Sequence, residues 1–131
     1  MDDRTVVARW LGGFQVDVQV REFSLRVDEP AQVGGTNTGP QPTDLLLSAV
    51  ASCFVLSLAY AAGKNKIKLD EIQVKATGTY LGLRFSTIQI EVILPLSSEE
   101  AADLIAAAER VCYVTNTLRH PPIITVVNLS G

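Results

Sequence analysis

The sequence predicts a single α+β domain over residues 1–131, with the order βββ-α-ββ-α-β and its helices packed on antiparallel sheet. Three features lead to this class. Short runs that alternate between apolar and polar residues occur before residue 30 and again between residues 67 and 94. Residues 45–63 are apolar and contain no Asp, Glu, Lys or Arg. Residues 97–112 carry apolar side chains at helical spacing.

Three strands are expected at the start of the chain. Residues 5–10 are β-branched and apolar, and residues 11–13 end in two glycines, which suit a tight turn. Residues 14–20 alternate, with Phe14 and three valines on one face. A turn at Arg21 and Glu22 leads into residues 23–27, which alternate in the same way. We therefore expect the three strands to form an antiparallel meander.

The central helix is expected over residues 45–63, after a loop rich in glycine and proline. A helix that is apolar on all sides is expected to be buried on all sides. A membrane span is the alternative, because spanning takes roughly 20 apolar residues. Ser48, Ser52 and Ser57 interrupt the run, and no basic cluster or aromatic belt marks its ends. These features favour a core helix.

The second half of the chain supplies the remaining elements. Gly63 is expected to end the central helix, with lysines close behind it. Strands are expected over residues 67–80 and 84–94. Ser97 and Glu100 have the spacing of a capping box, which predicts a helix from there to about Cys112. Residues 113–122 are expected to be a loop or an irregular helix end, and residues 123–129 a last strand.

Composition restricts the possible functions. A net charge of −3 gives no electrostatic footprint for nucleic acid. A mean hydropathy of +0.24 is high for a chain of this size and suggests that a second subunit covers apolar surface. The first residues lack the pattern of a signal peptide, so we expect a cytoplasmic protein. One histidine, His120, and two cysteines do not form a zinc signature, and no metal or cofactor is expected.

Two cysteine segments carry a resemblance. The run GGTNTGPQPTDLLLSAVASC at residues 34–53 resembles the signature of the OsmC/Ohr family (osmotically inducible protein C and organic hydroperoxide resistance protein). The segment VCYVTN at residues 111–116 is similar to the second-cysteine segment of that family, and the element order also fits. The resemblance implies an antiparallel sheet wrapped around a buried central helix, in an intertwined homodimer with its active sites at the subunit interface.

The resemblance also implies a chemistry. Family members reduce organic hydroperoxides and hydrogen peroxide with a cysteine pair, and a dithiol, in some cases of the lipoyl type, restores the thiols. The attacking role then falls on Cys53 and the resolving role on Cys112. The reacting species is a thiolate, and a sulfenic acid escapes further oxidation when a second thiol is near.

A thiolate in an apolar helix needs a cation nearby, because burial disfavours the charged form. In the family an arginine oriented by a glutamate supplies it. The nearest match here is Arg26, with Arg9 and Arg21 as alternatives. Thr43 occupies the position of the family glutamate, and Phe14 stands where Ohr-type proteins carry their arginine.

Two functional hypotheses follow. The first is a thiol peroxidase that uses Cys53, Cys112 and Arg26. The second is a dimer of the same fold that has lost the full peroxidase apparatus, and that binds a small apolar ligand or performs other thiol chemistry. In the second case Cys53 is a small apolar core residue, the commonest role of a free cysteine.

Overall fold

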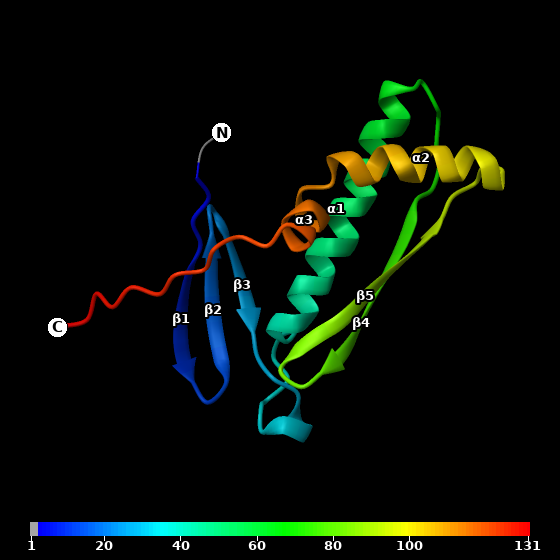
Figure 1. Cartoon of the computed structure of the whole chain (residues 1–131). Helices are drawn as coiled ribbons and strands as arrows, with labels where there is room; N and C mark the ends of the chain where they lie inside the picture. Colours follow the sequence, from blue (N-terminus) through cyan, green and yellow to red (C-terminus); the bar gives the residue numbers. More distant parts are fainter. Residues whose placement is uncertain (1–2) are drawn as a thin grey trace. The chain divides into compact units, whose positions relative to one another are not determined.

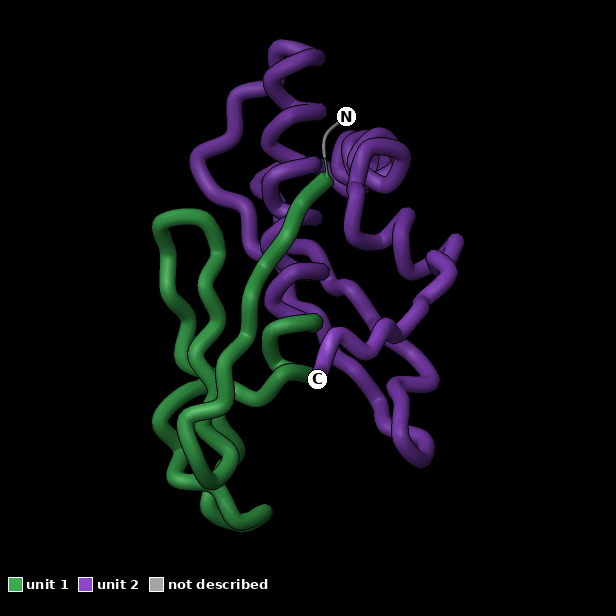
Figure 2. The backbone as a smooth tube through the Cα atoms, turned by 90° about the vertical axis from the view of Figure 1, so that its left-hand side faces the viewer, with its two compact units in different colours: residues 1–46 green, residues 47–131 purple. Residues whose placement is uncertain are grey.

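The structure is a computed structural model that describes residues 3–131. The chain divides into two compact units, residues 1–46 and 47–131 (Figure 2). The first unit consists mainly of antiparallel strands, and the second combines a strand hairpin with helices, as the sequence predicts.

The first unit contains a three-stranded antiparallel sheet in the order β1-β2-β3 (Figure 1). The strands are β1 (Val7–Gly12), β2 (Gln15–Val20) and β3 (Phe23–Val27). The expected turn at residues 11–13 is wrong by about two residues. The register shifts between Trp10 and Gly12, so Leu11 forms a β-bulge within β1. The chain turns at residues 13–14 instead.

The two faces of this sheet differ in chemistry. Cross-strand partners share a face, because successive side chains of a strand alternate between the two faces. Trp10, Val16 and Val27 are register neighbours on the apolar face, of which Val27 is buried whereas Trp10 is 75% exposed. Arg9, Asp17 and Arg26 are register neighbours on the opposite face. Arg26 therefore lies on the polar face of the sheet.

The glycine-rich loop that follows β3 is organised around Asp28, which is fully buried. Its carboxylate accepts hydrogen bonds from the hydroxyls of Thr36 (2.6 Å) and Thr38 (2.7 Å) and from the backbone N–H groups of Thr38 and Glu29. These bonds, led by the Thr36 hydroxyl, hold the pKa of Asp28 well below its usual range. The hydrogen-bond donors of Thr36 and Thr38 are therefore satisfied by the Asp28 carboxylate. A short 3₁₀ helix, η1 (Ala31–Val33), lies in the same segment.

The second unit contains most of α1 (Pro42–Lys64), the hairpin β4 (Gln73–Leu81) and β5 (Arg84–Ile93), α2 (Ser98–Val111) and α3 (Tyr113–Arg119) (Figure 1). One face of α1, including Phe54 and Leu58, packs with Leu104 and Ala108 of α2. Apolar residues of β4 and β5 pack against the same cluster. The core of this unit is therefore made by two helices and a hairpin.

The central helix is less buried than expected. Of its most apolar 18-residue window, 33% is buried, and Leu56 and Tyr60 are 69% and 59% exposed. By length and composition alone α1 could cross a membrane, a test that the core helix of a soluble protein also passes. Within one chain, the expectation of burial on all sides is not met, because the hairpin and α2 cover one side only.

The helix ends show one confirmed prediction and one wrong one. Ser97 accepts from the N–H of Glu100 at 3.2 Å, and the Glu100 carboxylate accepts from the N–H of Ser97, so the capping box is present. Gly63 does not end α1. The left-handed residue is Lys66, with φ of 58°, and Ile67 N donates to Ala62 O at 2.8 Å in a Schellman arrangement.

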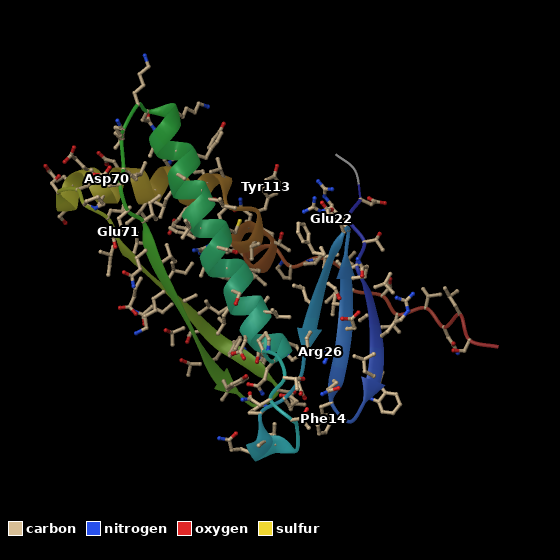
Figure 3. The ribbon with its side chains drawn as sticks, turned by 180° about the vertical axis from the view of Figure 1, so that it is seen from behind. Phe14, Glu22, Arg26, Asp70, Glu71 and Tyr113 are labelled. Carbon is tan, nitrogen blue, oxygen red and sulfur yellow. The ribbon has the colours of Figure 1, made fainter. Side chains whose placement is uncertain are left out.

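Three further expectations need correction. The strand predicted at residues 67–80 begins only at Gln73, after a connection that contains Asp70 and Glu71 (Figure 3). Residues 113–119 form a regular helix, α3. Residues 123–129 form no strand, and their large apolar side chains are 74–94% exposed. This segment has β-branched residues but no hydrogen-bonded neighbour, and strand preference depends on such packing.

Candidate functional site

The second unit brings the two cysteines together. Cys53 lies in the middle of α1 and is half-buried, whereas Cys112 is 0% exposed. Both are free thiols, and Cys53 packs against the buried cluster that contains Cys112. The sequence separates them by 59 residues, so the packing of α2 against α1 creates this pair.

Helical spacing explains how each cysteine reaches the other. Leu104, Ala108 and Cys112 follow one another at intervals of four residues, so Cys112 continues the buried stripe of α2. Cys112 itself has an extended backbone (φ −82°, ψ 105°) and separates α2 from α3. On α1, Cys53 precedes Phe54, which belongs to the same buried cluster. The cysteine pair therefore lies at the edge of the core of this unit.

A buried hydroxyl accompanies each cysteine one turn further along the chain. Ser57 donates to the carbonyl oxygen of Cys53 at 2.8 Å, and Thr115 donates to the carbonyl oxygen of Cys112 at 3.4 Å. Both side chains are buried. The sequence carries their signal, a hydroxyl residue three or four positions after each cysteine, but sequence reasoning assigned neither residue to the site.

These groups change the acidity of Cys112. Burial raises the pKa of this thiol, but hydrogen bonds from the side chain and backbone of Thr115, and from Cys53 and Ser57, outweigh it and lower the pKa below its ordinary value. A thiol with a lowered pKa is more often present as the thiolate, which is the reactive form. The lowered pKa therefore favours the thiolate form of Cys112, the buried cysteine of the pair.

A pocket of about 660 Å³ opens beside the pair, within the range usual for small-molecule sites. Most of its wall is apolar or aromatic, and among residues 3–131 Arg110 is the one charged residue that lines it. The lining residues are Cys53, Leu56, Ser57, Tyr60, Arg110, Val111, Tyr113 and Asn116. Tyr113 projects from the start of α3 (Figure 3). Cys53 lines this pocket and Cys112 does not, so a ligand in the pocket meets Cys53 first.

Arg26 lies in the first unit and is not among the residues that line this pocket. It is exposed on β3, and its carbonyl oxygen and side-chain stem lie against Gly39 of the loop (Figure 3). An exposed ion pair joins Arg21 to Glu22 at 3.9 Å. The assignment of Arg26 as the cation for Cys53 stays a prediction.

The other residues singled out in the sequence have local roles, as does Asp44 beside Thr43. Asp44 accepts a hydrogen bond from the N–H of Gln41 at 3.0 Å and so stabilises the start of α1, where Thr43 also lies. Phe14 is in the β1–β2 turn and is 53% exposed (Figure 3). His120 follows α3, with its Nδ1 3.2 Å from Asn116 O. Within residues 3–131 no group of three His, Cys, Asp or Glu residues could hold a metal ion.

Residues 35–127 match the family model described as OsmC-like protein. The chain belongs to the OsmC-like family. The match includes both cysteines and every residue of the pocket, and it begins after β1–β3 and Arg26. The family prediction from the two cysteine segments is confirmed.

Known relatives of this OsmC-like protein agree with the fold. An uncharacterized protein of Haloferax volcanii is 30% identical over 113 residues, which cover 82% of this chain and 80% of that protein. An OsmC-like protein of Mycoplasma pneumoniae superimposes with a TM-score of 0.77 at 20% identity, covering 92% of this chain and 89% of that one. An organic hydroperoxide resistance protein of Elizabethkingia anophelis has a TM-score of 0.66 at 27% identity, with 89% of each chain covered. The predicted α+β fold is therefore confirmed.

Proposed function

We propose that this OsmC-like protein is a thiol-dependent peroxidase that reduces organic hydroperoxides or hydrogen peroxide. The observation that carries the proposal is the packing of Cys53, which lines an apolar pocket, against the buried cluster that contains Cys112. Similarity to proteins named for organic hydroperoxide resistance supports the same function.

The chemistry follows from the positions of the two sulfurs. The Cys53 thiolate attacks the terminal peroxide oxygen, the O–O bond breaks, and the other oxygen leaves with the electron pair and takes up a proton from solvent to become an alcohol or water. Cys53 is then a sulfenic acid. The Cys112 thiolate attacks the Cys53 sulfur, the S–O bond breaks, the departing hydroxide takes up a proton from solvent to become water, and a Cys53–Cys112 disulfide forms. A dithiol, which we propose to be of the lipoyl type, reduces the disulfide.

Arg26 is proposed to supply a positive charge near Cys53. This charge stabilises the Cys53 thiolate and also the negative charge that develops on the departing oxygen. The support is the resemblance to the family, in which an arginine from the strands before the glycine-rich loop has this role. Arg26 is on the last of these strands, β3, next to the loop that leads into α1.

We also propose that the functional form is a homodimer of single-domain subunits in the cytoplasm. The support is apolar surface that one chain leaves uncovered. Leu56 and Tyr60 of α1 are more than half exposed, as are Trp10 and Ile123. Burial of such groups contributes about 25 cal/mol per Å² of apolar area, which favours association.

One alternative function has support of its own. The pocket is mostly apolar, and Thr43 takes the place of the family glutamate. A protein that binds a small apolar ligand, or performs another thiol reaction, would show these two features as well.

Titration of free thiols before and after a stoichiometric amount of cumene hydroperoxide separates the two functions. The peroxidase loses both free thiols of each native chain, and dithiothreitol restores them. A ligand-binding protein keeps both thiols after the same treatment and releases them to the titrant only on unfolding. Light scattering at micromolar concentration tests the dimer, since a folded monomer near 14.1 kDa would contradict it.

A further inference from the structure

The two sulfurs of the site differ in access. Cys53 lines the pocket, whereas Cys112 is 0% exposed and is absent from the pocket wall. A thiol that attacks a disulfide must reach one sulfur from the side opposite the S–S bond, so access decides which sulfur is attacked. From the pocket, only the Cys53 sulfur can be approached in this way.

We infer that the reductant attacks Cys53, that Cys112 leaves as the thiolate, and that Thr115 is the residue that positions a hydroxyl to receive this leaving group. This inference rests on the proposed function, because it concerns the disulfide formed in that cycle. It fixes the direction of the reduction step and adds a residue to the site.

The step balances as an ordinary thiol–disulfide exchange. A reductant thiolate forms an S–S bond to Cys53, the Cys53–Cys112 bond breaks, and its electron pair stays on the Cys112 sulfur. The second thiol of the dithiol then attacks the reductant's own sulfur in the mixed disulfide. Cys53 leaves as the thiolate, and the dithiol, now a cyclic disulfide, has given up two electrons.

Hydrogen-bond geometry selects Thr115 over Ser57. A hydroxyl has one proton to donate. Ser57 also lies near the Cys112 thiol, but its proton is held in a bond of 2.8 Å to the Cys53 carbonyl, and its effect on the pKa of Cys112 is smaller than that of Thr115. The corresponding bond from Thr115 to the Cys112 carbonyl is long, at 3.4 Å, so its proton can turn toward a thiolate at little cost. A hydrogen bond to a charged acceptor is also the stronger one.

The acidity of Cys112 agrees with this role. Burial opposes the charged form of Cys112, but contacts led by those of Thr115 lower its pKa below the ordinary value. The thiol with the lower pKa leaves faster in thiol–disulfide exchange. Access and leaving-group ability therefore both favour the release of Cys112.

A trapping experiment tests the direction of attack. The wild-type disulfide is made with diamide, exposed briefly to 2-mercaptoethanol, quenched with iodoacetamide and digested with trypsin. Cleavage after Arg26, Lys64, Arg110 and Arg119 places the cysteines in separate peptides, residues 27–64 and 111–119. We expect the mixed disulfide on residues 27–64 and the carbamidomethyl group on residues 111–119. The reverse distribution would overturn the inference.

Variants of Thr115 test its role. Thr115→Val keeps the shape of the side chain but removes the hydroxyl, and should slow the reduction of the disulfide by dithiothreitol by about three- to tenfold. It should also move the pH profile for alkylation of Cys112 in the reduced protein to higher pH. Thr115→Ser retains the hydroxyl, so its rate of disulfide reduction and its pH profile for alkylation of Cys112 should match those of the wild type. The matched control is Thr117→Val, whose hydroxyl donates to Tyr113 O at 2.7 Å in the same helix.

The outcomes separate this inference from the proposed function. If diamide forms the disulfide but hydroperoxide does not, the peroxidase proposal fails and the direction of attack is still measured. If the mixed disulfide forms on Cys112, or if Thr115→Val behaves as the wild type does, the inference fails while the peroxidase can stand. If diamide forms no disulfide, both fail.

Discussion

Replacement of Gly39 by alanine should open the loop that connects β3 to α1. Gly39 lies against the backbone of β3, and a methyl group placed on it would be 2.2 Å from Arg26 O and 2.8 Å from the Arg26 carbonyl carbon. Real Cβ atoms essentially never lie within 3.0 Å of such a neighbouring heavy atom. Because the obstacle is backbone and not the end of a flexible side chain, the loop itself has to move.

The cost follows from what the loop holds. Hydrogen bonds lie on both sides of Gly39, from Thr38 N to the Asp28 carboxylate at 3.0 Å and from Asp28 N to Pro40 O at 3.1 Å. Overpacking of a tight site typically costs about 1–3 kcal/mol, and each weakened hydrogen bond about 0.5–1.5 kcal/mol. We therefore expect Gly39→Ala to lower the free energy of unfolding by about 2–3 kcal/mol.

Gly63→Ala is the matched control. Gly63 lies in the last turn of α1, and a methyl group there meets nothing within 4 Å. Alanine is better than glycine inside a helix by about 0.5–1 kcal/mol, so this variant should be slightly stabilised. Urea unfolding followed by circular dichroism, at one fixed protein concentration, measures both changes. If Gly39→Ala unfolds at the same urea concentration as the wild type, the close approach of the loop to β3 is wrong.

The remaining predictions concern the helix cap, the loop carboxylate and the proposed cation. Ser97→Ala removes the capping box of α2 and should cost about 1 kcal/mol in urea unfolding. Asp28→Asn should lower the melting temperature at pH 7. Because the folded-state pKa of Asp28 is depressed, its contribution is present above the usual carboxyl range and is lost as pH falls through the lowered pKa. The gap between wild type and variant should therefore persist to pH 4 and close only in stronger acid; a gap already closed at pH 4 would contradict this. Arg26→Ala should slow the alkylation of Cys53 at neutral pH by about tenfold, or about 1.4 kcal/mol, whereas Arg9→Ala should not.

Local patterns in the sequence predicted much of the fold. The β3 strand (Phe23–Val27) and the helices α1 and α2 agree with the expected elements, and Ser97 caps α2 as expected. In each of these the relevant interactions are short-range, as in a capping box or the alternation of a strand. Such patterns are visible without knowledge of the tertiary structure.

The errors occurred where distant contacts decide the structure. Residues 123–129 have the composition of a strand, but a strand also needs a hydrogen-bonded neighbour, which no local pattern reveals. Gly63 had the right residue type for a helix end, yet Lys66 adopts the left-handed conformation, because the Schellman bonds form at that position.

The candidate site shows the same division. The sequence indicated Cys53 and Cys112 through the family resemblance. It gave no role to Thr115 or Ser57, whose positions depend on how α3 and α1 present their buried faces. It also indicated a loop at residues 34–40 but not its centre, Asp28, because the bonds from Thr36 and Thr38 join residues eight and ten positions apart.

The most direct test of the peroxidase proposal is the intact mass of the wild type, Cys53→Ser and Cys112→Ser after exposure of each native protein to excess cumene hydroperoxide. We predict that the wild type loses two hydrogens, as one intrachain disulfide forms between its two cysteines. Cys112→Ser should gain oxygen at Cys53, first as sulfenic and then as sulfinic acid, and Cys53→Ser should stay unchanged over the same time. The proposal would be contradicted if both thiols of the native wild type survived the hydroperoxide and yet reacted fully after unfolding.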